Sequence, residues 1–142
     1  YQIRSYLSKI SGPLLDRIDI QIEVPRLSEE ELLNKAEKGE SSETIRKRVI
    51  KAREIQLERF KKDNIVSNSR MTPKLIKKYC KLDTNCENLL RTAISKLNLS
   101  ARAYDRILKL SRTIADIENS KEINILHISE AIQYRNLDRN FF

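Results

Sequence analysis

The chain has 142 residues, enough for one domain with a modest hydrophobic core and too few for two independent cores. Its 28 lysines and arginines outnumber its 20 aspartates and glutamates, which gives a formal net charge of +8. Such an excess favours polyanionic partners such as nucleic acid or nucleotide phosphates, although many basic domains bind no anion.

The residues needed for several common sites are missing. Cys80 and Cys86 lie far from the single histidine, His127, so these residues cannot provide the four ligands of a structural zinc site. With only Gly12 and Gly39, no glycine-rich phosphate-binding loop can be written. We therefore expect reduced thiols, no metal site, no self-contained catalytic centre and a structural role for His127.

No apolar run approaches the length of a membrane span, and no charged and then apolar leader is present. We expect a cytoplasmic protein without membrane contact. The chain begins at Tyr1 inside patterned sequence, which indicates a part of a longer protein.

The first 24 residues predict a short β-strand. The segment RIDIQIEV alternates Ile18, Ile20, Ile22 and Val24 with polar residues, and Pro25 ends the pattern. No flanking strand is evident, so we expect residues 1–24 to be mobile or to be ordered by another copy of the chain. Arg17 lies between Asp16 and Asp19; it either pairs with a neighbouring aspartate or points at a group outside the chain.

The sequence after Pro25 predicts helices at about residues 29–37, 42–61, 73–80, 85–97, 101–118 and 125–135. Their starts are marked by capping residues: Ser28 with Glu31, Thr84 with Glu87, Thr72 before Pro73, Ser100 and Asn124. KKDNIVSNSR, residues 61–70, is polar and without periodicity, so it predicts a loop.

Apolar stripes at helical spacing predict a helical bundle. These stripes are Ile45, Val49, Ala52 and Phe60; Leu89, Leu90, Ala93, Ile94 and Leu97; Tyr104, Ile107, Leu108, Ile114 and Ala115; and Ile128, Ala131 and Ile132. The predicted fold class is thus mainly α, a helical bundle preceded by one short strand.

One group of residues around Ser100 suggests an anion site. With Ser100 as the cap, Arg102 lies in the first turn of a helix, where the helix dipole disfavours a cation by a few tenths to about 1 kcal/mol. Free backbone amides and a guanidinium together can bind phosphate, and Arg106 and Lys109 continue the same face. A solvated basic face is the simpler interpretation of the same pattern.

A second basic group is a candidate for nucleic-acid contact. Arg46, Lys47, Arg48, Lys51 and Arg53 are interleaved with glutamates, which predicts ordinary ion pairs along a helix. Lys74, Lys77, Lys78 and Lys81 have fewer acidic neighbours in the sequence. Few aromatic residues lie nearby, so any contact would be to backbone phosphate and not to stacked bases.

Three stretches together resemble a known family: YLSKISGPLLDRIDIQIEVP, GESSETIRKRVIKAREIQLERF, and LNLSARAYDRILKLSRTIADIENSKEI with the later HISEAIQYRNLDR. They are similar to the C-terminal part of the magnesium-chelatase-like AAA+ ATPases of the ComM/YifB competence-protein family. The resemblance implies that residues 1–24 are the end of the nucleotide-binding core, and that residues 25–142 are the helical lid of an AAA+ module.

The resemblance also implies roles for individual residues. Arg17 looks like an arginine finger that acts in trans, and Arg102 looks like the sensor-2 arginine, which in related ATPases acts in cis or in trans. Ser100 and Arg106, at the helix start described above, are then candidates for residues near the nucleotide. Asn98 stands where the family motif leads us to expect glycine, and asparagine tolerates the left-handed conformation that helix ends use.

For the full-length protein, the resemblance implies ATP and Mg²⁺ as cofactors, neighbouring subunits of a homo-oligomeric, hexameric ring as partners, and DNA as the substrate of a branch-migration motor. We expect this chain alone neither to bind nor to hydrolyse ATP. Two alternatives remain open from the residues themselves: a free-standing basic module that binds nucleic acid, and an oligomerisation domain.

Overall fold

The structure is a computed structural model that describes residue 14 and residues 17–26, 39–97 and 99–135. Over these residues the chain forms five α-helices and one 3₁₀ turn: α4 (Ser42–Arg59), η1 (Asn68–Arg70), α5 (Pro73–Tyr79), α6 (Thr84–Leu97), α7 (Ala101–Ile117) and α8 (Ile125–Gln133). The prediction of a mainly α chain is confirmed. The helix predicted at 29–37, with Ser28 and Glu31, lies outside the described residues.

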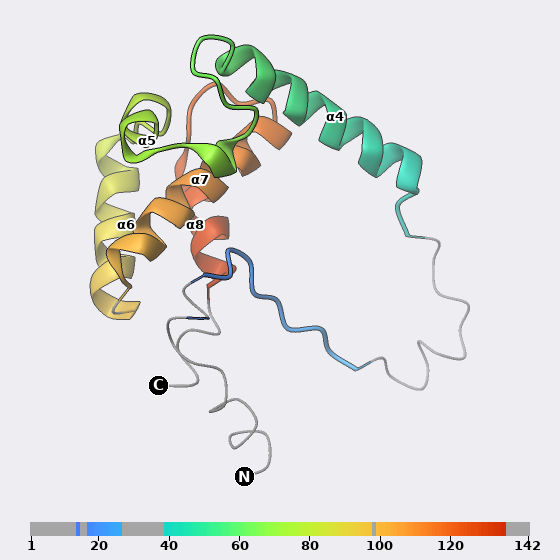
Figure 1. Cartoon of the computed structure of the whole chain (residues 1–142). Helices are drawn as coiled ribbons and strands as arrows, with labels where there is room; N and C mark the ends of the chain where they lie inside the picture. The colour runs from blue at the N-terminus through green and yellow to red at the C-terminus, as the bar shows by residue number, and fades with distance from the viewer. Residues whose placement is uncertain (1–13, 15–16, 27–38, 98, 136–142) are drawn as a thin grey trace.

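Helix α7 is the centre of the bundle. It packs against α4, α5, α8 and η1, and α6 in turn packs against α8. Figure 1 shows α4 extending away from the other helices, so that its C-terminal end alone reaches α7. The helix that carries Arg102 is therefore supported by most of the other elements.

The core lies along the inner face of α7. Ile107, Leu108, Ile114 and Ala115 are between 0% and 7% exposed. They belong to one apolar cluster with residues of the other elements, among them Phe60, Met71, Ile76, Leu90, Ile128 and Ala131. The stripes predicted for the last three helices mostly face this core, although Tyr104 is exposed at the surface.

The prediction of an apolar stripe along the helix expected at residues 42–61, which is α4, is only partly correct. Ile45 and Val49 are 41% and 49% exposed, whereas Ala52 and Phe60 are buried as predicted. The reason is tertiary: α4 projects beyond the bundle, and only its C-terminal half meets α7 (Figure 1).

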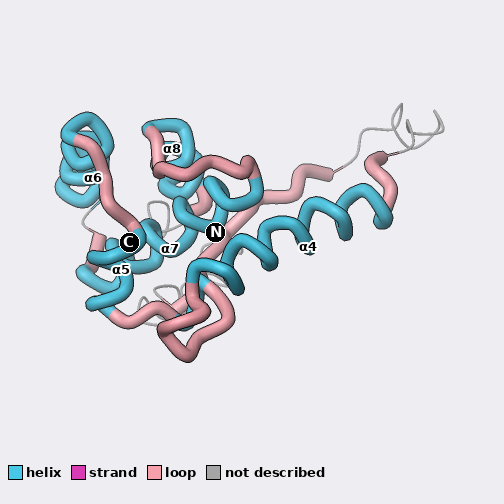
Figure 2. The backbone as a smooth tube through the Cα atoms, turned by 90° about the horizontal axis from the view of Figure 1, so that it is seen from above, coloured by secondary structure: helices cyan, strands magenta, loops and turns pink. Residues whose placement is uncertain are grey.

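The predicted strand is not formed. None of the described residues is in a β-strand, and residues 18–26 run as an irregular extended segment (Figure 2). The expected burial is also reversed, because Gln21 is 8% exposed while Ile18, Ile20, Ile22 and Val24 are 40% to 80% exposed. A strand needs a neighbouring strand for its backbone hydrogen bonds, and here the segment bonds instead to the helical bundle of the same chain, which the sequence did not lead us to expect.

Local capping signals predict most helix starts correctly. Ser100 Oγ accepts from the Ala103 N–H at 3.2 Å, and Asn124 Oδ1 accepts from the N–H groups of Leu126 and His127 at 2.9 and 3.2 Å. Pro73 is the first residue of α5, after Thr72. The Thr84 prediction is wrong by one residue, since Asp83 Oδ1 caps α6 by accepting from the Cys86 N–H at 2.7 Å.

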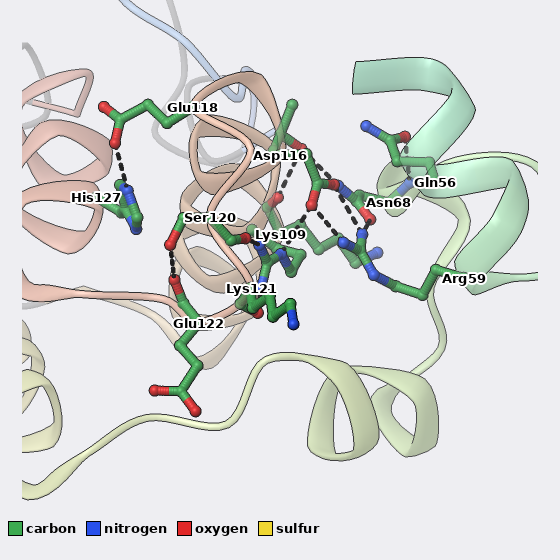
Figure 3. A network of polar contacts seen from close by, with 12 residues as sticks. Gln56, Arg59, Asn68, Lys109, Asp116, Glu118, Ser120, Lys121, Glu122 and His127 are labelled. Carbon is green, nitrogen blue, oxygen red and sulfur yellow. Dashed lines mark hydrogen bonds and ion pairs between the residues drawn. The ribbon is translucent and has the colours of Figure 1, made fainter. Parts of the chain in front are cut away.

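His127 completes the cap of α8 from the other side. Its Nδ1 accepts the Asn124 N–H at 3.0 Å, and its Nε2 lies 2.8 Å from a Glu118 carboxylate oxygen (Figure 3). Because Nδ1 is an acceptor here, Nε2 carries the hydrogen and donates it to Glu118. The side chain is fully buried, and the structural role predicted for His127 is confirmed.

A buried polar network joins α4, η1 and α7 around Asp116 (Figure 3). The Asp116 carboxylate has no exposed surface and accepts from Arg59 Nη1 at 2.7 Å and from Asn68 Nδ2 at 2.8 Å. Arg112 Nε donates to it at 3.1 Å. Two arginines and one amide thus satisfy a single buried carboxylate, which offsets the cost of removing that charge from water.

The network extends into the neighbouring loops. The two terminal nitrogens of Arg112 donate to the carbonyl oxygens of Lys121 and Ser120 at 2.9 and 2.6 Å. On the other side, Gln56 Oε1 accepts from the Asn68 backbone N–H at 3.1 Å. Burial lowers the pKa of Arg112, because it removes the charged guanidinium from water, and the nearby Asp116 charge opposes this shift. The carboxylate thus stabilises the charged form of Arg112 inside the protein.

The two cysteines are free and buried. Burial raises the pKa of the Cys80 thiol to about 11. Burial, together with the neighbouring Asp83 carboxylate, raises the pKa of the Cys86 thiol to about 11 as well. Neither thiol is placed or ionised as a reactive cysteine would be.

Replacing Asp116 by asparagine should lower the free energy of unfolding by about 3–5 kcal/mol, because Arg59 and Arg112 then keep their buried charges without a carboxylate. Urea denaturation measures this loss. The matched control is Glu43→Ala, which breaks the exposed Glu43–Lys47 pair at 2.8 Å and should cost no more than about 1 kcal/mol. Equal losses for the two variants would contradict the structural importance of the network.

Both thiols should resist a thiol reagent at pH 8 in the folded chain. A pKa of about 11 leaves about one thiol in a thousand ionised at that pH, and burial blocks the reagent as well. Titration with a chromogenic disulfide should therefore find almost no reactive thiol before urea is added and both thiols afterwards. Rapid labelling of either cysteine in the folded chain would be the contrary result.

Candidate functional site

The start of α7 presents Arg102 to solvent. Ser100 caps the helix, the first turn contains no acidic residue, and the Arg102 side chain is exposed. The helix dipole makes this a poor place for an unpaired cation and a good place for an anion. The local sequence LSAR produces this arrangement, since the serine cap fixes where the helix begins.

An open groove of about 340 Å³ runs along the outer face of α7. Arg102, Asp105, Arg106 and Lys109 line it from α7, together with Leu110 and Thr113. The other walls come from Asp19 and Ile20 of the extended segment and from Ser69 of η1. The basic face predicted at Arg102, Arg106 and Lys109 is therefore one wall of a single groove.

The three cations of this groove have different partners. Arg106 pairs with the Asp19 carboxylate, and its Nη1 also donates to the Arg17 carbonyl oxygen at 2.9 Å. Lys109 Nζ donates to the Ser69 carbonyl oxygen at 3.0 Å. Within the part of the chain that the structure describes, Arg102 has no side-chain hydrogen bond or ion pair, so it is the cation of the groove that is available to an added anion.

Arg17 lies on the extended segment that borders the groove. Its side chain is exposed, and its backbone N–H donates to the Leu14 carbonyl oxygen at 2.9 Å. Asp19, one of the two aspartates that flank Arg17 in the sequence, pairs with Arg106 instead. Arg17 itself has no ion pair among the described residues, so the expected pairing with a neighbouring aspartate is not formed at Asp19; Asp16 lies outside the described residues.

The four lysines around α5, namely Lys74, Lys77, Lys78 and Lys81, differ in their environment. All four are exposed, but Lys78 Nζ lies 3.2 Å from Asp63 and 4.5 Å from the centre of the Tyr79 ring. The Tyr79 hydroxyl donates to Asp63 and, with Lys78, holds the pKa of that carboxyl below its usual range. Lys81 lines a second hollow of about 480 Å³ together with Lys121.

The ion pairs predicted along α4 are confirmed only in part, because Arg46, Lys51 and Arg53 have no carboxylate partner within the described residues. Lys47 contacts Glu43 at 2.8 Å, and Arg48 contacts both carboxylate oxygens of Glu40 at 2.7 and 3.0 Å. The partner of Lys78 was not predictable, because Asp63 lies in a loop 15 residues away in the sequence. Lys74, Lys77 and Lys81 are exposed and have no carboxylate partner within the described residues, so they remain candidates for phosphate contact.

Sequence reasoning missed the residues at the end of α8 that contact the extended segment. The Tyr134 carbonyl oxygen accepts from the Gln21 N–H at 2.8 Å, and Arg135 Nη1 donates to the Ile18 carbonyl oxygen at 3.0 Å. These contacts join residues more than a hundred positions apart, so no local pattern could have indicated them.

Across the described residues there is no group of three or more histidine, cysteine, aspartate or glutamate side chains that could hold a metal ion. No helix in that part of the chain is both long and apolar enough to cross a bilayer.

Comparison with known families and proteins gives consistent matches. Residues 39–135 match the family described as magnesium chelatase, subunit ChlI C-terminal, and residues 1–32 match magnesium chelatase, subunit ChlI. The chain is 47% identical to the competence protein ComM of Haemophilus influenzae over 138 residues, which are 97% of this chain and 26% of that protein.

Two further relatives are uncharacterized proteins named YifB. The one from Salmonella typhimurium is 44% identical and the one from Escherichia coli is 41% identical, each over 97% of this chain and 26% of the relative. The chain thus spans about a quarter of the length of these relatives. With most of its residues matched by one family model, the chain belongs to the magnesium chelatase subunit ChlI C-terminal family.

Proposed function

We propose that this chain is the C-terminal lid region of a ComM/YifB-like, magnesium-chelatase-related AAA+ ATPase, and that the full-length protein is a ring-shaped DNA motor acting in branch migration, DNA uptake and recombination. The observation that carries this proposal is Arg102, an exposed arginine without a side-chain partner among the described residues, in the capped first turn of α7. Arg102 acts as the sensor-2 arginine, which binds the phosphates of ATP.

The physical case for Arg102 rests on charge. A cation in the first helical turn is unfavourable alone, by a few tenths to about 1 kcal/mol, and becomes favourable when a phosphate joins it. The guanidinium and the free amides next to Ser100 then donate to the same anion. Arg106 stays a predicted neighbour of the nucleotide, although its guanidinium already binds Asp19 and the Arg17 carbonyl.

Arg17 is the arginine finger of this proposal. Its side chain is exposed while its backbone is bound to the helical bundle, which suits a residue that reaches into a neighbouring subunit of the ring. There the guanidinium stabilises the charge that develops on the transferred γ-phosphate.

ATP and Mg²⁺ are cofactors of the full-length protein in this proposal. The first turn of α7 fits a phosphate group, whereas the described residues offer no set of metal ligands. We assign Mg²⁺ and the phosphate-binding loop to another part of the full-length protein, since this chain spans 26% of the length of its relatives. When bound, Mg²⁺ neutralises part of the charge on the phosphates.

DNA contact is assigned to the lysines around α5. Lys74, Lys77 and Lys81 are exposed and have no ion pair within the described part of the chain. Lys78 contributes less, because Asp63 neutralises it. Such contacts favour backbone phosphate over any base sequence.

In the full-length protein, Arg17→Ala and Arg102→Ala should each reduce ATP hydrolysis at least about tenfold, a loss of roughly 1.4 kcal/mol of transition-state stabilisation. Folding should be unchanged by circular dichroism, because both side chains are exposed. Arg53→Ala, an exposed arginine on α4, is the control and should retain full activity.

A mixing experiment tests whether Arg17 acts in trans. Rings assembled from Arg17→Ala subunits and subunits with a defective phosphate-binding loop should regain some activity, since a residue that acts in trans complements the other defect. Failure to regain activity, with mixed rings demonstrated by mass spectrometry, would remove Arg17 from the role of arginine finger.

For DNA binding, the triple replacement of Lys74, Lys77 and Lys81 by alanine should weaken affinity for every DNA sequence. The slope of log K against log salt should fall by about 0.9 for each DNA phosphate that the variant no longer neutralises. The matched control replaces Lys47, Arg48 and Lys61, three exposed cations that already pair with glutamates. If the control triple reduces the slope equally, net charge and not the α5 lysines determines binding.

A further inference from the structure

The extended segment is attached to the helical bundle at residues 17, 18, 19 and 21. Arg106 of α7 binds the Arg17 carbonyl oxygen at 2.9 Å and pairs with the Asp19 carboxylate. Arg135 Nη1 donates to the Ile18 carbonyl oxygen at 3.0 Å, and the Gln21 N–H donates to the Tyr134 carbonyl oxygen at 2.8 Å. In Figure 1 this segment, in blue, passes beside the end of α8.

These contacts are protected from water to different degrees. Arg135 is 1% exposed and Gln21 is 8% exposed, so the two contacts at the end of α8 lie inside the fold. The Arg106 side chain is 25% exposed and reaches the segment from the outer face of α7. Charged donors on backbone carbonyls and carboxylates make stronger hydrogen bonds than neutral ones, so the segment is firmly held without a β-sheet.

Arg106 connects the two arginines of the proposed function. It lies four residues after Arg102, which places both side chains on the same face of α7, and both line the groove. On its other side, the Arg106 guanidinium binds the backbone of Arg17 itself. Through Arg106, the helix that carries Arg102 is thus linked directly to the backbone of Arg17.

We propose that Arg106 is a positioning residue, which fixes the backbone of Arg17 to the helix of Arg102 so that both arginines move as one unit. This inference rests on the proposed function, in which Arg102 senses the nucleotide and Arg17 serves the neighbouring subunit. Nucleotide bound at one site then shifts the helical bundle as a whole, and with it the direction in which Arg17 points at the next site. Arg106 acts through Arg17 and does not bind the nucleotide directly.

The first test measures the attachment itself, by amide hydrogen exchange of the full-length protein. Arg106→Ala should speed exchange of the Gln21 amide, which donates to the Tyr134 carbonyl oxygen, at least about tenfold, while the amides of α7 and α8 keep their protection. The matched control is Arg48→Ala, which breaks an arginine–carboxylate pair on α4 and should leave exchange of the Gln21 amide unchanged. Unchanged exchange in Arg106→Ala would overturn the proposal.

The second test separates positioning from direct binding by ATPase kinetics. Arg106→Ala should lower kcat at least about fivefold with KM for ATP changed less than twofold, because the substitution detaches the Arg17 segment and leaves the nucleotide's own ligands in place. Arg106→Lys should recover part of kcat, since an ammonium can still pair with Asp19. A tenfold rise in KM with normal exchange would mean that Arg106 is itself a phosphate ligand, and would reject the proposal.

The third test is a double mutant, which also distinguishes this proposal from the proposed function. If Arg106 acts through Arg17, the Arg17→Ala, Arg106→Ala protein should be no more than twofold slower than Arg17→Ala alone. Multiplied defects would reject positioning through Arg17. If Arg17→Ala alone is fully active, the finger assignment itself fails, and with it the catalytic consequence of Arg106, while hydrogen exchange still decides whether Arg106 holds the segment.

Discussion

The buried carboxylate of Asp116 is the constraint on which the arrangement of this chain depends. It receives Arg59 from the end of α4, Asn68 from η1 and Arg112 from its own helix. Arg59 and Asp116 are 57 residues apart in the sequence, and an unpaired charge at either position would be costly inside the protein. This one network holds two loops against α7: the loop between α4 and α5, and the loop after α7.

Helix α7 consequently has two roles on two faces. Its inner face carries the apolar core and the Asp116 network, which hold it in place. Its outer face carries Arg102, Arg106 and Lys109 along the groove. A rigid support of this kind is what a phosphate-binding arginine requires, because the gain from an oriented guanidinium is lost when its helix can move independently.

The partners of each cation decide which positive charges are available to a ligand. Lys47, Arg48 and Lys78 have carboxylate partners, and Arg106 is engaged with the extended segment. Among the described residues, Arg102 on α7 and the lysines 74, 77 and 81 have no such partners, and neither have Arg46, Lys51 and Arg53 of α4. The net charge of +8 therefore overstates how much of the surface can attract an anion, and it is the contacts that separate the candidate phosphate sites from ordinary ion pairs.

The sequence by itself determined what is local: the start of α7 at Ser100, the cap of α8 at Asn124, the proline start of α5, and the alignment of Arg102, Arg106 and Lys109 on one helix face. Caps and helical periodicity act over three or four residues, so they can be read along the chain. Tertiary structure alone decided that Ile45 and Val49 stay exposed, that Asp63 neutralises Lys78, and that Gln21 is buried while the isoleucines around it are not. Each of these outcomes depends on which distant segment lies alongside, and period-two alternation shows that a segment has two faces without showing which one finds a partner.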